Sequence, residues 1–125
     1  MIRIMLIAGI GGFFGTVARF ASVRFIAQFT NVSFPYGTLF VNIAGSFLIG
    51  ILFALSAKTT ILSSEMKILL TTGFCGGFTT FSTFALDCVH LINDEQYLSV
   101  ASYLLISIFS GILAVFLGIW IIKLF

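Results

Sequence analysis

The sequence predicts an all-α membrane protein with four transmembrane helices, the third of them interrupted near its middle. Hydrophobic residues make up 60% of the 125 residues and charged residues only 8%, and the mean hydropathy is +1.23. Such a chain has too little polar surface to cover a water-soluble globule. Because a membrane span takes about 20 apolar residues, the length allows about four spans with short loops. We therefore expect a single membrane domain over residues 1–125.

The composition also excludes several function classes. The net charge is +2 without a basic cluster, which argues against a nucleic-acid partner. Cys75 and Cys88 lack a metal-binding spacing, and the chain has one histidine, so no disulfide or thiolate metal site is expected. Asp87 and His90 lie near the end of a span, where side chains are usually solvated. No nucleophile, base and orienting group converge, so we predict that the protein is not an enzyme.

The first span is expected over residues 4–27. Its small residues fall near one helical face, and Gly11 and Gly15 have the small-xxx-small spacing that lets another helix approach closely. Arg19 lies on the same side, about four turns into the helix. An arginine at that depth must reach the interface, pair with another group or face water. We expect Arg19 to face protein or an aqueous vestibule, whereas Arg24 extends to the nearer membrane surface.

The second span is expected over residues 34–56, with Pro35 at its first turn. Thr38, Asn42, Gly45 and Ser46 share one face of this helix. Asn42 is the informative residue, because an asparagine inside a span either joins helices through a hydrogen bond or contacts a solute. The spacing alone favours neither role.

The third span, over residues 66–92, contains the least helical stretch of the chain, Gly73–Phe84. As one helix the span would measure about 40 Å, against a hydrocarbon core of about 30 Å. Adjacent glycines weaken a helix and hydroxyl side chains divert its hydrogen bonds. Irregular backbone at membrane depth is tolerated where it is buried in protein or lines a wet cavity. We therefore expect an ion or substrate site here, with Phe81 and Phe84 on one side of the helix that restarts after the break.

The fourth span is expected over residues 97–125. Tyr103, Ser107, Ser110 and Gly111 lie on one side of this helix. The hydroxyl groups either form a polar track or bond back to their own helix, and packing is the simpler expectation.

The distribution of basic residues across the membrane is only weakly biased. Arg3, Lys58, Lys67 and Lys123 belong to one side, and Arg24, with Arg19, to the other. A weak positive-inside signal allows insertion in both orientations. Two copies in opposite orientations would form an antiparallel, dual-topology homodimer, which repeats with two chains what inverted-repeat transporters do within one. Four short helices alone scarcely enclose a pathway.

Three stretches together resemble a known family. Gly11–Phe20 reads GGFFGTVARF, Gly37–Phe47 reads GTLFVNIAGSF, and Gly73–Phe84 reads GFCGGFTTFSTF. The chain resembles the bacterial Fluc, or CrcB, fluoride channels over essentially its whole length, and the third stretch is the most specific. The resemblance implies a homodimer with two pores in the bacterial inner membrane, surrounded by lipid. It implies passive export of cytoplasmic fluoride down its electrochemical gradient, which confers fluoride resistance.

The resemblance also implies roles for individual residues. Phe81 and Phe84 would contact fluoride, with Asn42 as their polar partner. The backbone carbonyls of Gly76 and Thr79 would hold a central, structural sodium ion shared by the two subunits. Arg19 matches an arginine that holds loops or draws anions into the vestibule. The implied polar track, which is the less specific part of the match, consists of Thr80, Ser82, Thr83, Thr38, Tyr103 and Ser107.

Two positions depart from the family pattern. Asp87 stands where glutamate is common, which puts in doubt any role that needs the longer side chain. Phe20 stands where tyrosine is common, which removes a hydroxyl group. The main alternative function is a small dual-topology multidrug or cation exporter, but such a carrier should hold a carboxylate within the membrane, and the first span has none. A non-transporting packing subunit would leave the broken third span unexplained.

Overall fold

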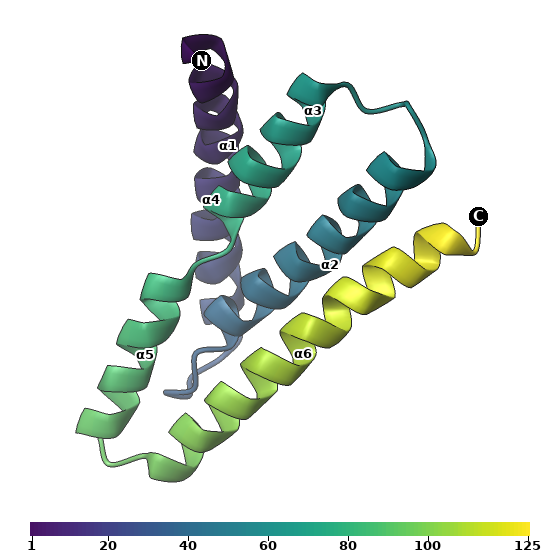
Figure 1. The fold of residues 1–125 in the computed structure, drawn as a ribbon. Helices are drawn as coiled ribbons and strands as arrows, with labels where there is room; N and C mark the ends of the chain where they lie inside the picture. The colour runs from purple at the N-terminus through teal and green to yellow at the C-terminus, as the bar shows by residue number, and fades with distance from the viewer.

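The computed structural model describes residues 1–125 as helices joined by short connections (Figure 1). Helices α1 (Ile2–Ala27), α2 (Tyr36–Lys58) and α6 (Tyr97–Lys123) are each continuous. The segment Ser64–Asn93 is built from several shorter helices. Four segments are long and apolar enough to cross a membrane, which confirms the expected number of spans. Their ends lie within two residues of the expected limits.

The ends of the helices are set by local hydrogen bonds. The third span begins where Ser63 Oγ accepts a hydrogen bond from Met66 N at 3.2 Å, the N-cap arrangement expected for serine. Pro35 directly precedes α2, where its missing N–H costs no helical bond. Lys58 Nζ donates to Ile122 O at 3.0 Å, so the C-terminal end of α6 is tied to that of α2. The N-terminus, the α2–α3 connection and the C-terminus therefore lie at one end of the molecule (Figure 1).

The third span changes conformation four times. It begins as α3 (Ser64–Ile68), widens into the π-helix η1 (Leu69–Cys75) and continues as α4 (Gly76–Phe78). Thr79 and Thr80 are extended, with φ −89° and ψ 162° and with φ −154° and ψ 122°, and α5 (Phe81–Asn93) follows. The expected glycine pair, Gly76 and Gly77, is helical in this structure. The extended residues are the two threonines after it.

The glycines instead allow α1 and the third span to touch through their backbones. A Cβ atom on Gly15 would collide with Phe74 O, and one on Gly11 would collide with Leu69 O. On the other side of the contact, a Cβ on Gly77 would lie 2.5 Å from Gly12 O. The small-xxx-small spacing in α1 therefore serves packing against η1 and α4, because only glycine permits so close an approach.

Helices α2 and α6 pack against each other in the same way (Figure 1). A Cβ on Gly50 would collide with Val115 O, and one on Gly118 with Phe47 O. Near the other end of α6, Tyr103 is fully buried against Leu91 and Val100. Large apolar side chains such as Phe109 and Phe116 point outward, as expected for helices that face lipid.

Candidate functional site

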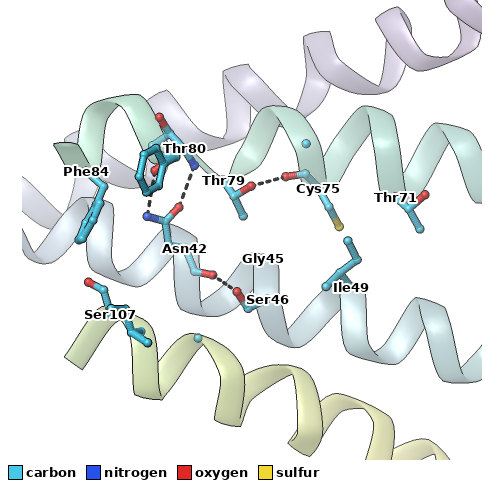
Figure 2. Close-up of a pocket in the computed structure, with 14 residues that line it drawn as sticks. Asn42, Gly45, Ser46, Ile49, Thr71, Cys75, Thr79, Thr80, Phe84 and Ser107 are labelled. Atoms are coloured by element: carbon cyan, nitrogen blue, oxygen red, sulfur yellow. Dashed lines mark hydrogen bonds between the residues drawn. The ribbon is translucent and has the colours of Figure 1, made fainter. Parts of the chain in front are cut away.

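The break in the third span opens onto a pocket between α2, the third span and α6 (Figure 2). Its volume is about 410 Å³. No charged side chain lines it, and the polar groups are amide, hydroxyl and backbone groups. The lining residues are Asn42, Gly45, Ser46, Ile49, Thr71, Cys75, Gly76, Thr79, Thr80, Phe81, Phe84, Ser107, Ile108 and Gly111.

Asn42 holds the extended backbone at Thr80 by two hydrogen bonds. Its Nδ2 donates to Thr80 O at 3.1 Å, and Thr80 N donates to its Oδ1 at 2.8 Å (Figure 2). The side-chain amide thus pairs with one residue of the break much as a neighbouring β-strand would. Without this pairing, the backbone N–H and C=O groups of Thr80 would lack a partner, because neither takes part in a helical hydrogen bond.

Two hydrogen-bond donors in the pocket remain free for a ligand. An asparagine amide carries two N–H groups, and Asn42 makes only one donor contact, so the second N–H is available. Ser107 Oγ is buried and has no hydrogen-bond partner at all. A buried hydroxyl without a partner costs free energy, which a ligand that accepts a hydrogen bond would recover. A set of donors without any carboxylate suits an anion.

Phe81 and Phe84 add aromatic ring edges to these donors. Their ring centroids lie 5.8 Å apart with the planes tilted by 42°, and both rings line the pocket. Ring edges carry partial positive charge. They can therefore face an anion, and they bind it less strongly than a cationic group would. Phe81 is 79% exposed in the single chain, so this side of the pocket is open to the surface.

Other residues predicted for the site lie beside the pocket. Thr38 and Tyr103 are buried and do not line it. The hydroxyl group of Tyr103 donates to Asp87 Oδ2 at 2.9 Å, so its only proton is already engaged. The expectation that Asp87 is simply solvated is wrong, because Asp87 is half-buried and bonded to Tyr103.

Ser82 and Thr83 belong to the cap of α5. Thr80 Oγ1 accepts from Thr83 N at 3.2 Å and donates to Thr83 Oγ1 at 3.1 Å, and Ser82 Oγ lies 3.4 Å from Thr80 Oγ1. These hydroxyl groups therefore start the helix after the break, as a threonine N-cap does. Ser82 is exposed, and neither Ser82 nor Thr83 lines the pocket.

The carbonyl oxygens at the end of α4 have the chemistry of a sodium site. Outside the helices, no hydrogen bond reaches Gly76 O or Thr79 O, and both residues line the pocket. Cys75 O, by contrast, accepts from both Thr79 N and Thr79 Oγ1 at 3.0 and 2.9 Å. Free carbonyl oxygens are ligands that suit a hard cation such as Na⁺. The residues therefore fit such an ion.

Arg19 contacts the break from the side of α1. Its Nε donates to Gly77 O at 2.9 Å, and it does not line the pocket. The sequence predicts that Arg19 faces protein or a vestibule, but it does not indicate this acceptor. It also does not indicate that Thr71, Cys75 and Ile49 line the pocket. The two hydrogen bonds between Asn42 and Thr80 have no sequence signal other than a polar residue inside a span.

Comparison with known proteins places the chain in a family. The sequence profile described as "CrcB-like protein, Camphor Resistance (CrcB)" matches residues 6–119. The chain belongs to the CrcB family. It is a multi-pass membrane protein, with the four spans described above.

Several CrcB relatives carry the name "Fluoride-specific ion channel FluC". The relative from Chlorobium phaeobacteroides is 45% identical over 120 residues, covering 96% of this chain and 93% of the relative. The relative from Campylobacter jejuni (strain 81-176) is 40% identical over 123 residues, covering 98% of this chain and all of the relative. The relative from Leptospira interrogans (strain Fiocruz L1-130) is 37% identical over 119 residues, covering 95% and 94%. These CrcB proteins are named as ion channels, so the family is not enzymatic.

Proposed function

We propose that the protein is a fluoride channel that lets cytoplasmic fluoride leave passively, down its electrochemical gradient, across the bacterial inner membrane. The observation that carries the proposal is the pocket at the break, where the free N–H of Asn42, the unpartnered Ser107 hydroxyl group and two phenyl rings converge. Fluoride is small and strongly hydrated. A pore must therefore replace its water by donors while binding it weakly enough to release it.

The proposed physiological role is fluoride resistance. A weak acid crosses a membrane in its neutral form, and its anion is trapped where the pH is higher. A membrane potential that is negative inside drives an anion outward, so a passive channel is enough to remove the trapped ion. The names of the relatives support this substrate.

We further propose that two copies in opposite orientations form the channel, with two pores per homodimer. Phe81 and Gly76 line the pocket but are exposed in the single chain, so a second copy can close it. A closed two-fold assembly is also the commonest form of oligomer. Thr38, Tyr103, Ser82 and Thr83 would then support the pathway from behind its wall, while Asn42, Thr80, Phe81, Phe84 and Ser107 would line it.

The proposed structural cation is Na⁺, held by Gly76 O and Thr79 O where two copies meet. Both carbonyl oxygens are free of hydrogen bonds from the connecting segments. When bound, the ion would supply a fixed positive charge beside the pocket. The residues of the chain hold this geometry through Asn42 and through the bonds of Thr79 to Cys75 O.

Fluoride efflux from proteoliposomes tests the function directly. Purified protein in vesicles loaded with potassium fluoride should release fluoride after addition of a potassium ionophore, followed with a fluoride electrode. Vesicles loaded with chloride should release none. Efflux no faster than from protein-free vesicles would refute the channel. A pH-gradient-driven exchange of organic cations in the same vesicles would instead support the multidrug or cation exporter.

Dual topology is tested by labelling a single terminal cysteine. Cys75 and Cys88 are replaced by alanine, and a cysteine is added after Phe125. In intact cells, a membrane-impermeant maleimide should label about half of the chains. Labelling of all chains or of none would show one orientation and contradict the antiparallel dimer.

The sodium site is tested by thermal stability. The melting temperature of the detergent-solubilised dimer should fall when Na⁺ is replaced by a large organic cation, and equal stability would contradict the sodium site.

A further inference from the structure

Arg19 lies further from the end of its span than any other basic residue of the chain, and it has no acidic partner. The structure contains one ion pair, between Arg3 and Glu65 at the end of the molecule. Arg19 is half-buried, and its Nε donates to a backbone oxygen, Gly77 O, at 2.9 Å. Ionisable side chains inside a membrane pair with one another or with backbone carbonyls. The position of Arg19 is therefore explained by the carbonyl it contacts.

Gly77 O is available only because the third span breaks after Phe78. In a continuous α-helix this oxygen would accept from the N–H group four residues later, that of Phe81. Phe81 instead begins α5 after two extended residues. The last carbonyls of α4 are left without helical donors, and a cation at a helix C-terminus satisfies them and interacts favourably with the helix dipole. Arg19 thus closes the end of α4.

The break is held from two sides by two side chains. Arg19, from α1, binds Gly77 O, and Asn42, from α2, binds both polar groups of Thr80. Between these fixed points lie Phe78 and Thr79, and Thr79 lines the pocket. Gly77 is also in backbone contact with Gly12, so α1 meets the end of α4 both at this glycine contact and at the Arg19 hydrogen bond. A rotation of the Gly77 peptide would shift Gly76 and Thr79, which are close to it in the chain and which line the pocket.

We propose that Arg19 is a positioning residue of the conduction pathway, and that its Nε–H hydrogen bond to Gly77 O is what conduction requires of it. The positive charge of Arg19 serves a lesser role, because the side chain is not part of the pocket lining. This inference rests on the proposed fluoride conduction. It differs from a vestibule arginine that attracts anions by its charge.

Three substitutions separate the hydrogen bond from the charge. In Arg19→Gln, the amide Nε2 is separated from Cα by the same number of bonds as the arginine Nε, so the donor is kept and the charge is lost. In Arg19→Lys, the charge is kept, but a methylene group stands where Nε was and the ammonium group lies one atom further out. Arg19→Leu removes both. All three variants keep a side chain long enough to fill the space beside α4.

The expected order of fluoride efflux follows from the donor. Arg19→Gln should conduct within about fivefold of the unmodified protein, since a neutral donor gives a weaker bond than a charged one. Arg19→Lys and Arg19→Leu should both lose at least about tenfold. The ratio between the unmodified protein and Arg19→Gln should stay constant when an impermeant potassium salt is added at constant Na⁺, because screening weakens attraction between separated charges more than it weakens a direct hydrogen bond.

A second measurement separates positioning from a general loss of structure. The Na⁺ concentration that gives half of the thermal protection of the solubilised dimer should be unchanged in Arg19→Gln and raised in Arg19→Lys. A merely structural defect would lower the melting temperature at every Na⁺ concentration without moving this midpoint. The inference would be overturned if Arg19→Gln were no better than Arg19→Leu in fluoride efflux or in assembly of the dimer. It would also be overturned if Arg19→Lys conducted fluoride as fast as the unmodified protein. An unmodified protein that does not conduct fluoride refutes the proposed function instead.

Discussion

Replacing Asn42 by alanine should both destabilise the protein and abolish its conduction. The substitution removes the bonds of 3.1 and 2.8 Å that hold Thr80 O and Thr80 N. Each buried polar group left without a partner costs about 1–3 kcal/mol, so the pair costs about 2–6 kcal/mol. The pocket is open on the side of Phe81, so water can reach the freed groups and replace part of the loss. We therefore expect a loss of about 2–3 kcal/mol in the free energy of unfolding.

The assay is a titration with sodium dodecyl sulfate in mixed micelles, followed by far-ultraviolet circular dichroism, together with fluoride efflux from proteoliposomes. Ser46→Ala is the matched control. Ser46 lines the same pocket one turn further along α2, but its Oγ donates to Asn42 O within its own helix at 2.7 Å. Removing such a bond leaves the helix intact, so the control should change the free energy of unfolding by less than about 0.5 kcal/mol.

The two measurements together decide whether Asn42 supports the break. A variant Asn42→Ala that loses efflux but unfolds within about 0.5 kcal/mol of the unmodified protein would show that Asn42 acts only as a ligand in the pocket. The reasoning from its two bonds to Thr80 would then be refuted. An equal loss of stability in Ser46→Ala would also count against it, since the effect would not be specific to those bonds.

Three further substitutions test other parts of the structure. Ser107→Ala removes a buried hydroxyl group without a partner. The same titration should show a free energy of unfolding that is unchanged or raised by up to about 1 kcal/mol, while fluoride efflux falls. A loss of stability would mean that the hydroxyl group is hydrogen-bonded. Gly15→Ala sets a Cβ against the backbone of η1, whereas Gly9 has open space around it. In size-exclusion chromatography, the Gly15→Ala variant should fail to form the dimer, and the Gly9→Ala control should elute like the unmodified protein. Tyr103→Phe leaves Asp87 without its donor at 2.9 Å and should cost about 1.5–3 kcal/mol in the same titration, which the double variant with Asp87→Leu should partly restore.

Much of the fold could be predicted because it depends on features that the sequence expresses directly. Apolar length predicts the spans, and the start of α2 at Pro35 follows from local chemistry that operates within a few residues. The shared face of Asn42, Gly45 and Ser46 follows from helical periodicity, and all three line the pocket. These expectations needed no knowledge of which helix lies beside which.

The details of the site could not be predicted, because they depend on contacts between helices far apart in the sequence. Gly76 and Gly77 predict a weak point in the third span, but both are helical, with Gly77 packed against Gly12 of α1, and the extended residues are Thr79 and Thr80. The π-helical form of η1 has no marker in its composition. The position of Asp87 near the span end predicts a solvated side chain, whereas its hydrogen-bond partner Tyr103 lies on another helix.

The backbone contact between α1 and η1 has a consequence for synthesis of the chain. Gly11 meets Gly73, which follows it by 62 residues. At about 5–20 residues per second, a ribosome takes about 3–12 seconds to deliver that partner. During this time the glycine face of α1 has entered the membrane without the surface it fits, and lipid chains cannot fill a groove shaped for a backbone. Helix α1 should therefore stay near the insertion machinery until the third span arrives, so the two leave it as a pair.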